Sequence, residues 1–309
     1  MDMDATGLDP GTPGAKGDAT NRGRVRLRDR VLLNEDLNFL LTNRIPRGLA
    51  TRWMGWFSRI RSPILTRFSI AVWRLFTDLD LSEAKHRRFE SLQACFTREL
   101  REGARPVDPT EGMLISPCDG IVGACGEVRG RRVFQAKGFP YSISDLFGSE
   151  RAAEPYQDGC YATLRLTSAM YHRFHAPADG KVTKVVYLSG DTWNVNPIAL
   201  KRVERLFCRN ERAALTLVLP DGRPLALVAV AAILVASIRL HCIDTLLHPH
   251  WKGPSEIPCD SGVSRGQELG WFEHGSTIIV FAPRGFRLCD AVSEGATIRM
   301  GQPLLRADQ

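Results

Sequence analysis

The residues with the clearest chemical potential are a serine on a permissive turn and two histidines far upstream. Ser276 follows Gly275 and leads into an apolar, strand-like run. His172 and His175 belong to a Tyr-His-Arg-Phe-His cluster. A serine needs a base to take its proton and a donor to hold the oxyanion before it can attack an amide. The pairing indicates serine chemistry, and Gly275 would permit the strained backbone that attack on the chain's own amide requires.

Each of these residues also has a simpler interpretation. Gly-Ser-Thr is a common turn. The two histidines share a face if their segment is helical, which suits acid–base work, structural packing or a metal pair. No third ligand of metalloprotease type follows them, so we predict no metal. Asp119 precedes a glycine and is by itself a turn former, and only a nearby imidazole would make it an orienting carboxylate. Asp179 has the same local setting.

Composition narrows the class of protein. The 309 residues are 44% hydrophobic and 24% charged, which is ordinary for a globular chain. A net charge of +7 favours anionic partners, either nucleic acid or an anionic membrane. The eight cysteines show no C-x-x-C spacing, which argues against zinc and redox motifs and fits a reducing compartment. The longest apolar run, Leu225 to Ile238, is too short to span a bilayer and predicts buried core.

The N-terminal third divides into two parts. Residues 1–24 are rich in Gly, Pro, Thr and Asp, lack the apolar stretch of a signal peptide, and predict a disordered leader. Residues 25–105 form a basic helical region. Within it, residues 37–77 hold seven arginines, three tryptophans and no acidic residue, with Pro46 and Pro63 dividing about three helices. Arginine with Trp and Phe is typical of interfacial membrane helices; the alternative is a helical subdomain packed on the core. No nucleic-acid motif accompanies the arginines.

From residue 106 to 309 the sequence changes to short apolar stretches separated by Gly, Pro and Asp turns. This pattern predicts a mainly antiparallel β domain. The whole chain is therefore expected to be an α+β protein. A weak internal repeat, Ser116–Val122 against Ala176–Val182, is also found in lipoyl and biotinyl carrier domains, but no lysine occupies the position that a carrier needs.

Six ordered blocks resemble the phosphatidylserine decarboxylase family over nearly the whole chain. They are Ser116–Gly120, Lys137-Gly138 with Tyr141-Ser142, Tyr171–His175, Gly190–Pro197, Asn210–Arg212 and Gly275–Thr277. The chain departs from the family pattern at His274, commonly Leu, and at Thr192 and Trp193, usually Leu and Phe. The glycines that the family has within 231–238 are also missing. These departures affect the expected details of the substrate pocket.

The resemblance implies a self-processing, pyruvoyl-dependent lyase. His175 would deprotonate Ser276, and Asp119 would hold the imidazolium. Ser276 would attack the Gly275 carbonyl and split the chain into a β chain ending at Gly275 and an α chain of 276–309. The remaining pyruvoyl group, a covalent cofactor derived from Ser276, would act as the electron sink for decarboxylation of phosphatidylserine to phosphatidylethanolamine. His172 would be the general acid.

The resemblance also implies partners and a location. The partners would be the phospholipid substrate, an anionic membrane surface, and the chain's own α and β products as a heterodimer, with no nucleic acid. The protein would lie peripherally on the cytoplasmic face of a bacterial cell membrane. Two other hypotheses remain: a noncatalytic lipid-binding protein of the same fold, and a serine hydrolase using Ser276, His175 and Asp119.

Overall fold

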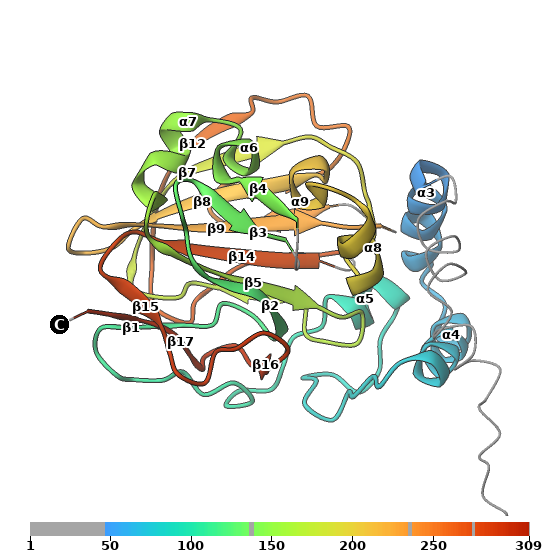
Figure 1. Ribbon diagram of the computed structural model, residues 1–309. Coiled ribbons are helices and arrows are strands. Elements are labelled where there is room, and N and C mark those ends of the chain that lie inside the picture. The colour runs from blue at the N-terminus through green and yellow to red at the C-terminus, as the bar shows by residue number, and fades with distance from the viewer. Residues whose placement is uncertain (1–46, 136–138, 234–236, 274–275, 309) are drawn as a thin grey trace, which may run out of the picture.

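The computed structural model describes residues 47–135, 139–233, 237–273 and 276–308 (Figure 1). The predicted leader, the first helix of the 37–77 region, the Lys137-Gly138 block, His274 and Gly275 lie outside the described residues.

Two helices at the N-terminal end of the described chain lie to one side of the β domain (Figure 1). They are α3 (Arg47–Ser58) and α4 (Pro63–Phe76). Ser62 caps α4 by accepting a hydrogen bond from the Leu65 amide, and Pro63 occupies the first turn, where no amide is needed. The predicted boundary between two helices at Pro63 is confirmed. A short helix, α5 (Leu92–Phe96), connects this region to the β domain.

The described residues of the β domain form four antiparallel sheets. The largest has the order β12-β7-β8-β9-β14-β5-β2-β16, and a second has the order β11-β10-β13-β6. The others are β1-β17-β15 and β3-β4. The strands are β1 (Met113–Ile115), β2 (Gly120–Glu127), β3 (Arg132–Phe134), β4 (Pro140–Ser142), β5 (Cys160–Leu166), β6 (Arg173–His175), β7 (Gly180–Leu188), β8 (Arg212–Val218), β9 (Pro224–Ala231), β10 (Ile238–Leu240), β11 (Thr245–Leu247), β12 (Glu256–Val263), β13 (Glu268–Phe272), β14 (Ser276–Ala282), β15 (Phe286–Leu288), β16 (Thr297–Ile298) and β17 (Pro303–Ala307). The predicted mainly antiparallel β domain is confirmed.

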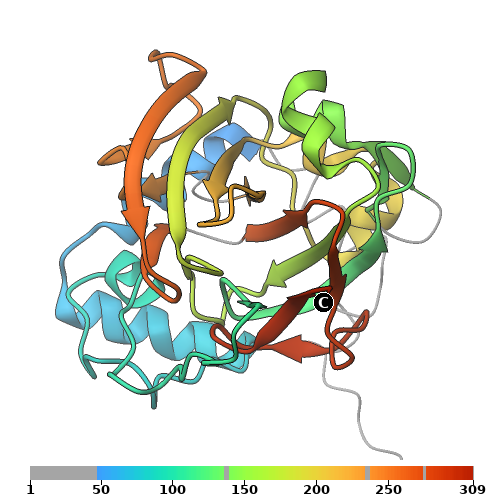
Figure 2. The same cartoon turned by 90° about the vertical axis from the view of Figure 1, so that its left-hand side faces the viewer.

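The central strands of the eight-stranded sheet are buried on both faces. On β14, Ile278 and Val280 belong to one hydrophobic cluster, while Ile279 and Phe281 belong to the other. The first cluster is closed by the four-stranded sheet and the β1-β17-β15 sheet (Figure 2). The second is covered by the short helices α6 (Ile143–Phe147), α7 (Glu150–Ala153), α8 (Pro197–Arg202) and α9 (Leu206–Arg209), with a 3₁₀ turn at Glu154–Tyr156. Burial on both faces explains why β9 and β14 are continuous apolar runs.

The internal repeat is a structural pair. Ile115 donates its amide hydrogen to the carbonyl of Pro177, and His175 donates its amide hydrogen to the carbonyl of Pro117. The two Pro-bounded entries therefore lie side by side, and the strands β2 and β7 begin at the glycine of each Asp-Gly pair. This contact brings the Asp119 turn next to the strand that carries His175.

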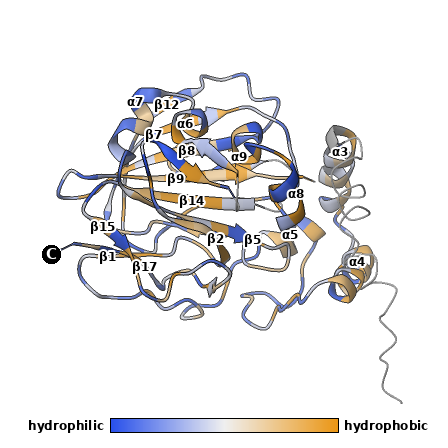
Figure 3. Cartoon of the chain, viewed as in Figure 1, coloured by the Kyte–Doolittle hydropathy of each residue, from blue (hydrophilic) through white to orange (hydrophobic). Residues whose placement is uncertain are grey.

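The apolar residues of α3 and α4 are divided between core and solvent. Trp53 and Trp56 are 57% and 64% exposed, and Phe68 on α4 is 66% exposed. Trp73 instead stacks on the buried Phe96, with ring centroids 5.8 Å apart. Figure 3 shows apolar stretches along α4, outside the β domain. None of the described helices is long and apolar enough to cross a membrane.

Candidate active site

The predicted cleavage bond lies where the chain passes from one sheet to another. β13 ends at Phe272 in the four-stranded sheet, and β14 begins at Ser276 in the eight-stranded sheet. Gly270 allows β13 to approach β10 closely, because a Cβ there would lie 1.9 Å from the Arg239 carbonyl oxygen. The strands on both sides of residues 273–275 are thus fixed by sheet pairing.

Ser276 is fully buried at the start of β14. It pairs with Leu166 of β5 on one side and with Ala231 of β9 on the other. Its exposed fraction is 0%, and its hydroxyl has no hydrogen-bond partner among the described residues. An unsatisfied buried hydroxyl costs stability, which is a reason to look for a chemical role.

Glu273 anchors the segment that leads to Ser276. Its side chain is buried, yet it accepts a 2.7 Å hydrogen bond from Arg59, directly after α3. It accepts a second 2.7 Å bond from Gln93 of α5, and its amide donates to the Ser237 carbonyl. The basic helical region is therefore joined to the segment before Ser276 by a charge-assisted contact.

His172 lies beside the same segment. The Phe272 amide donates to the His172 carbonyl at 3.1 Å, and the imidazole packs on Phe96 with ring centroids 3.9 Å apart. Nδ1 lies 2.9 Å from the Met170 carbonyl oxygen. Because a carbonyl only accepts, Nδ1 carries the hydrogen, and Nε2 of the neutral ring is the basic nitrogen.

His175 has the same tautomer in a different setting. Its Nδ1 donates to the Gly266 carbonyl at 2.9 Å, and its Nε2 accepts from the Tyr171 hydroxyl at 3.0 Å. Burial lowers the pKa of His175, opposed by the Gly266 hydrogen bond and by nearby carboxylates. The imidazole is therefore held neutral, as a base must be. Arg173–His175 form the strand β6 and His172 directly precedes it, so the two histidines do not share a helical face.

Asp119 is paired with an arginine in this structure. Arg105 donates to both carboxylate oxygens, at 2.8 and 2.5 Å, and the Met300 amide donates to one of them at 2.9 Å. These are its hydrogen bonds among the described residues, so the predicted contact with an imidazole is not formed here. Asp119 is buried and Asp179 is exposed. Among the residues that the structure describes, Asp179 accepts only the amide of Arg265, which distinguishes the two turns.

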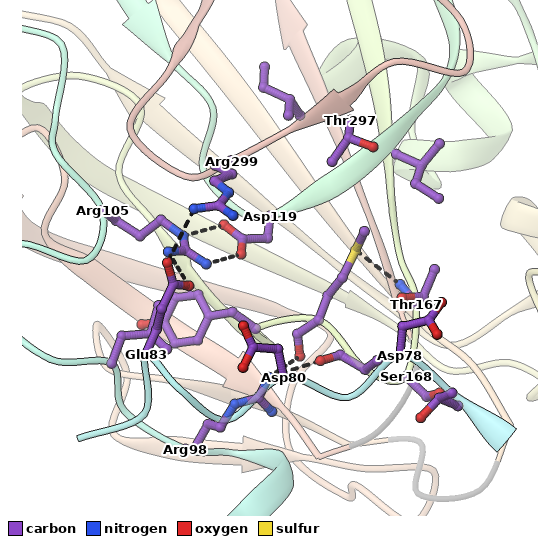
Figure 4. A pocket seen from close by; sticks show the side chains of 17 residues that line it. Asp78, Asp80, Glu83, Arg98, Arg105, Asp119, Thr167, Ser168, Thr297 and Arg299 are labelled. Carbon is purple, nitrogen blue, oxygen red and sulfur yellow. Dashed lines mark hydrogen bonds and ion pairs between the residues drawn. The ribbon is translucent and has the colours of Figure 1, made fainter. Parts of the chain in front are cut away.

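Asp119 and His175 face adjoining cavities. A cavity of about 510 Å³ is lined by Asp119 together with the charged side chains of Glu83, Arg98 and Arg299 (Figure 4). A second, of about 300 Å³, is lined by His175. Arg105 and Tyr171 line both. The described residues that line these cavities do not include Ser276 or His172.

Two further family-like blocks meet beside β14. The Asn210 side chain accepts from the Trp193 amide at 2.9 Å and donates to the carbonyls of Trp193 and Ala231 at 2.8 Å. Ala231 is the strand neighbour of Ser276. Asn210 contacts the backbone of Trp193 and not its side chain. These contacts can therefore form although Trp193 replaces the Phe that is usual in the family.

Sequence reasoning missed Arg105, Tyr171 and Glu273 as members of the site. Tyr171 lies within the histidine block, and its spacing from His175 was a usable signal. Arg105 and Glu273 carry no local signal, since their partners are distant in sequence. Within the described ranges, no group of three or more His, Cys, Asp or Glu side chains is arranged to hold a metal ion.

Comparison with known proteins agrees with this arrangement. Residues 92–306 match the family described as phosphatidylserine decarboxylase. The chain is 34% identical over 269 residues to the phosphatidylserine decarboxylase proenzyme of Idiomarina loihiensis, covering 84% of this chain and 92% of that one. It is 36% identical over 283 residues to the proenzyme of Anaeromyxobacter sp. (strain K), covering 88% and 99%. These similarities define the chain as a decarboxylase, a carbon–carbon lyase. It belongs to the phosphatidylserine decarboxylase family.

Proposed function

We propose that this chain is a proenzyme that converts Ser276 into a pyruvoyl group and then decarboxylates phosphatidylserine to phosphatidylethanolamine. The observation that carries the proposal is the buried, unpartnered hydroxyl of Ser276 at the first residue of a central strand. Its relatives are described as proenzymes of phosphatidylserine decarboxylase, which supports the same conclusion.

Self-cleavage follows from atoms of the chain itself. The Ser276 oxygen attacks the Gly275 carbonyl carbon, the amide C–N bond breaks, and the serine nitrogen takes a proton. The resulting ester is cleaved by β-elimination: the Cα proton of residue 276 is removed, the Cβ–O bond breaks, and the Gly275 carboxylate leaves. The dehydroalanine tautomerises to an imine, which water hydrolyses to a ketone with loss of ammonia.

The base for the first step is assigned to His175, which is neutral and carries its lone pair on Nε2. Asp119 supports the imidazolium as a nearby negative charge. It lies close to His175 because the carbonyl of Pro117, two residues earlier, accepts a hydrogen bond from the His175 amide. A second assignment exchanges the two histidines. The register of β6 against β13 favours it, because His172 lies opposite Phe272 while His175 lies opposite Glu268, farther from Ser276 along the strand.

The pyruvoyl group would be held by the pairing of residue 276 with Leu166 and Ala231. When formed, it supplies an electrophilic carbonyl that draws electrons from the bond to the leaving carboxylate. His172 holds its proton-accepting Nε2 in a fixed direction, because the Met170 carbonyl and Phe96 orient the ring. Once Nε2 has taken up a proton, the imidazolium is suited to deliver that proton to carbon after carbon dioxide leaves.

The membrane contact is assigned to α3 and α4. Trp53, Trp56, Phe68 and Leu75 expose more than half of their surface, and arginines lie among them on both helices. Apolar side chains of this kind enter the acyl boundary while guanidinium groups meet lipid phosphates. We place the protein peripherally, on the cytoplasmic face of a bacterial membrane where the substrate lies.

The test is release of carbon dioxide from phosphatidylserine vesicles by the purified wild type and by Ser276→Ala. Activity in the wild type alone supports the proposal. Equal activity in both would overturn the role of Ser276. An intact wild-type chain that reacts with fluorophosphonates and releases no carbon dioxide would instead identify a serine hydrolase.

A further inference from the structure

A groove on the N-terminal side of the molecule lies apart from the catalytic residues. It has a volume of about 470 Å³ and runs between α4 and the segment from Leu81 to Phe89. None of the four predicted catalytic residues lines it. α4 is fixed against this segment by a hydrogen bond from the Thr66 hydroxyl to the Glu90 carbonyl, at 3.2 Å. The groove therefore belongs to the folded protein.

The charge of the groove is uniformly positive. Arg67 and Arg74 of α4 face Arg87 and Arg88 of the opposite segment, and no Asp or Glu is among the described residues that line it. Within the described part of the chain, none of the four guanidinium groups forms an ion pair. Asp80 interacts electrostatically with Arg74, and the Asp80 carboxylate is already hydrogen-bonded to Ser82. Four unpaired guanidinium groups around one cavity favour a phosphate, which accepts their paired N–H donors.

The groove is also partly apolar, and it adjoins the exposed apolar face of α4. Its lining includes Ile70 and Phe89. On α4, the lining positions 63, 66, 67, 70, 71 and 74 follow helical spacing. The exposed apolar residues Ile64, Phe68 and Val72 form the neighbouring stripe. A ligand with its phosphate in the groove can thus lay acyl chains along the stripe that is proposed to enter the bilayer.

We propose that this groove is a binding site for the headgroup phosphate of an anionic phospholipid, separate from the site of decarboxylation. The ligand is an amphiphile, because a free phosphate would leave the apolar lining and the adjoining stripe of α4 uncovered. The inference rests on the membrane contact proposed for α4, and it needs neither self-cleavage nor turnover.

The experiment measures binding of the full chain to vesicles of phosphatidylcholine alone and of phosphatidylcholine mixed with phosphatidylglycerol, which is not the proposed substrate. The variant is Arg87→Gln/Arg88→Gln, which leaves both helices unchanged. The matched control is Arg129→Gln/Arg132→Gln, two exposed arginines, one after β2 and one at the start of β3. It removes the same charge from the β domain. A second variant, Arg67→Gln/Arg74→Gln, removes the other wall of the groove.

Each basic group at an anionic surface accounts for roughly a fivefold change in affinity, so either groove variant should bind mixed vesicles roughly 30-fold more weakly. The control should bind nearly as the wild type does. Binding to neutral vesicles, which tests the apolar contact of α3 and α4, should persist in all variants. If the control variant binds mixed vesicles as weakly as the groove variants do, the groove is not a binding site, and the net positive charge of the protein explains the binding. Displacement of the wild type from mixed vesicles by millimolar inorganic phosphate would overturn the assignment to a lipid.

Discussion

Arg59 donates a 2.7 Å hydrogen bond to Glu273, joining the end of α3 to the segment that leads to Ser276. Arg59 is half-exposed and Glu273 is buried. A surface ion pair contributes little to stability, but removing the partner of a buried carboxylate leaves a desolvated charge. The contact therefore helps to hold the segment that leads to Ser276 in place.

Replacing Arg59 with alanine should slow self-cleavage, because Glu273 would lose a charged partner and pull the segment toward solvent. The disruption should be on the order of 1–3 kcal/mol. The measurement is the half-time of chain splitting on a denaturing gel. Arg52→Ala is the matched control, since Arg52 is an exposed arginine of α3 itself. In the double variant Arg59→Ala/Glu273→Gln the buried charge is gone, so the rate should recover. No recovery would disprove the electrostatic explanation.

The two histidines should have separable effects. His175→Ala and Asp119→Ala should block chain splitting, whereas His172→Ala should split substantially and then release carbon dioxide slowly. Gels and a decarboxylation assay on the same preparations measure both steps. A chain that stays whole with His172→Ala and splits normally with His175→Ala would establish the exchanged assignment.

Glu211 should make folding stability depend on pH. Burial raises its pKa to about 8. The geometry agrees: the Tyr187 oxygen lies 2.7 Å from both Glu211 and the His248 carbonyl. Its single hydrogen goes to the carbonyl, which can only accept, so a protonated Glu211 donates to Tyr187. A raised folded pKa gives stability that is complete below the ordinary value of about 4.3 and is lost as the pH rises toward 8.

The measurement is thermal unfolding of Glu211→Gln against wild type from pH 5 to pH 8. The advantage of the variant should grow by up to about 1.4 kcal/mol per pH unit across that range. Glu204→Gln, at an exposed position, should show no such trend. A pH-independent difference for Glu211→Gln would mean that the carboxyl is ionised in the folded protein.

Trp53 and Trp56 should contribute to membrane binding, while Trp73 should contribute to folding. The first two are exposed, and the third stacks on Phe96. Trp53→Ala/Trp56→Ala should lose the part of vesicle binding that survives high salt and keep the melting temperature. Trp73→Ala should lower the melting temperature. Co-sedimentation measures vesicle binding, and thermal unfolding measures the melting temperature. If the two variants change both quantities equally, the tryptophans do not have separate roles.

The sequence predicted the β domain well because short apolar runs separated by Gly, Pro and Asp turns are local signals. Catalytic roles for Ser276, His172, His175 and Asp119 came from resemblance rather than from spacing, and they stay predictions. The sequence could not predict that Asp119 pairs with Arg105, because that contact depends on how the 78–105 segment crosses the β domain. For the same reason the sequence could not predict which tryptophans are exposed, because Trp73 differs from Trp53 only in the residues that pack against it.

The most direct test of the central claim is the intact mass of the purified protein under denaturing conditions. The account predicts two chains, residues 1–275 and residues 276–309, with the smaller one lighter than its unmodified sequence by one ammonia and resistant to Edman degradation. Ser276→Ala should give one chain of full mass. A wild-type protein that is catalytically competent and yet consists of a single unmodified chain of 309 residues would contradict the account.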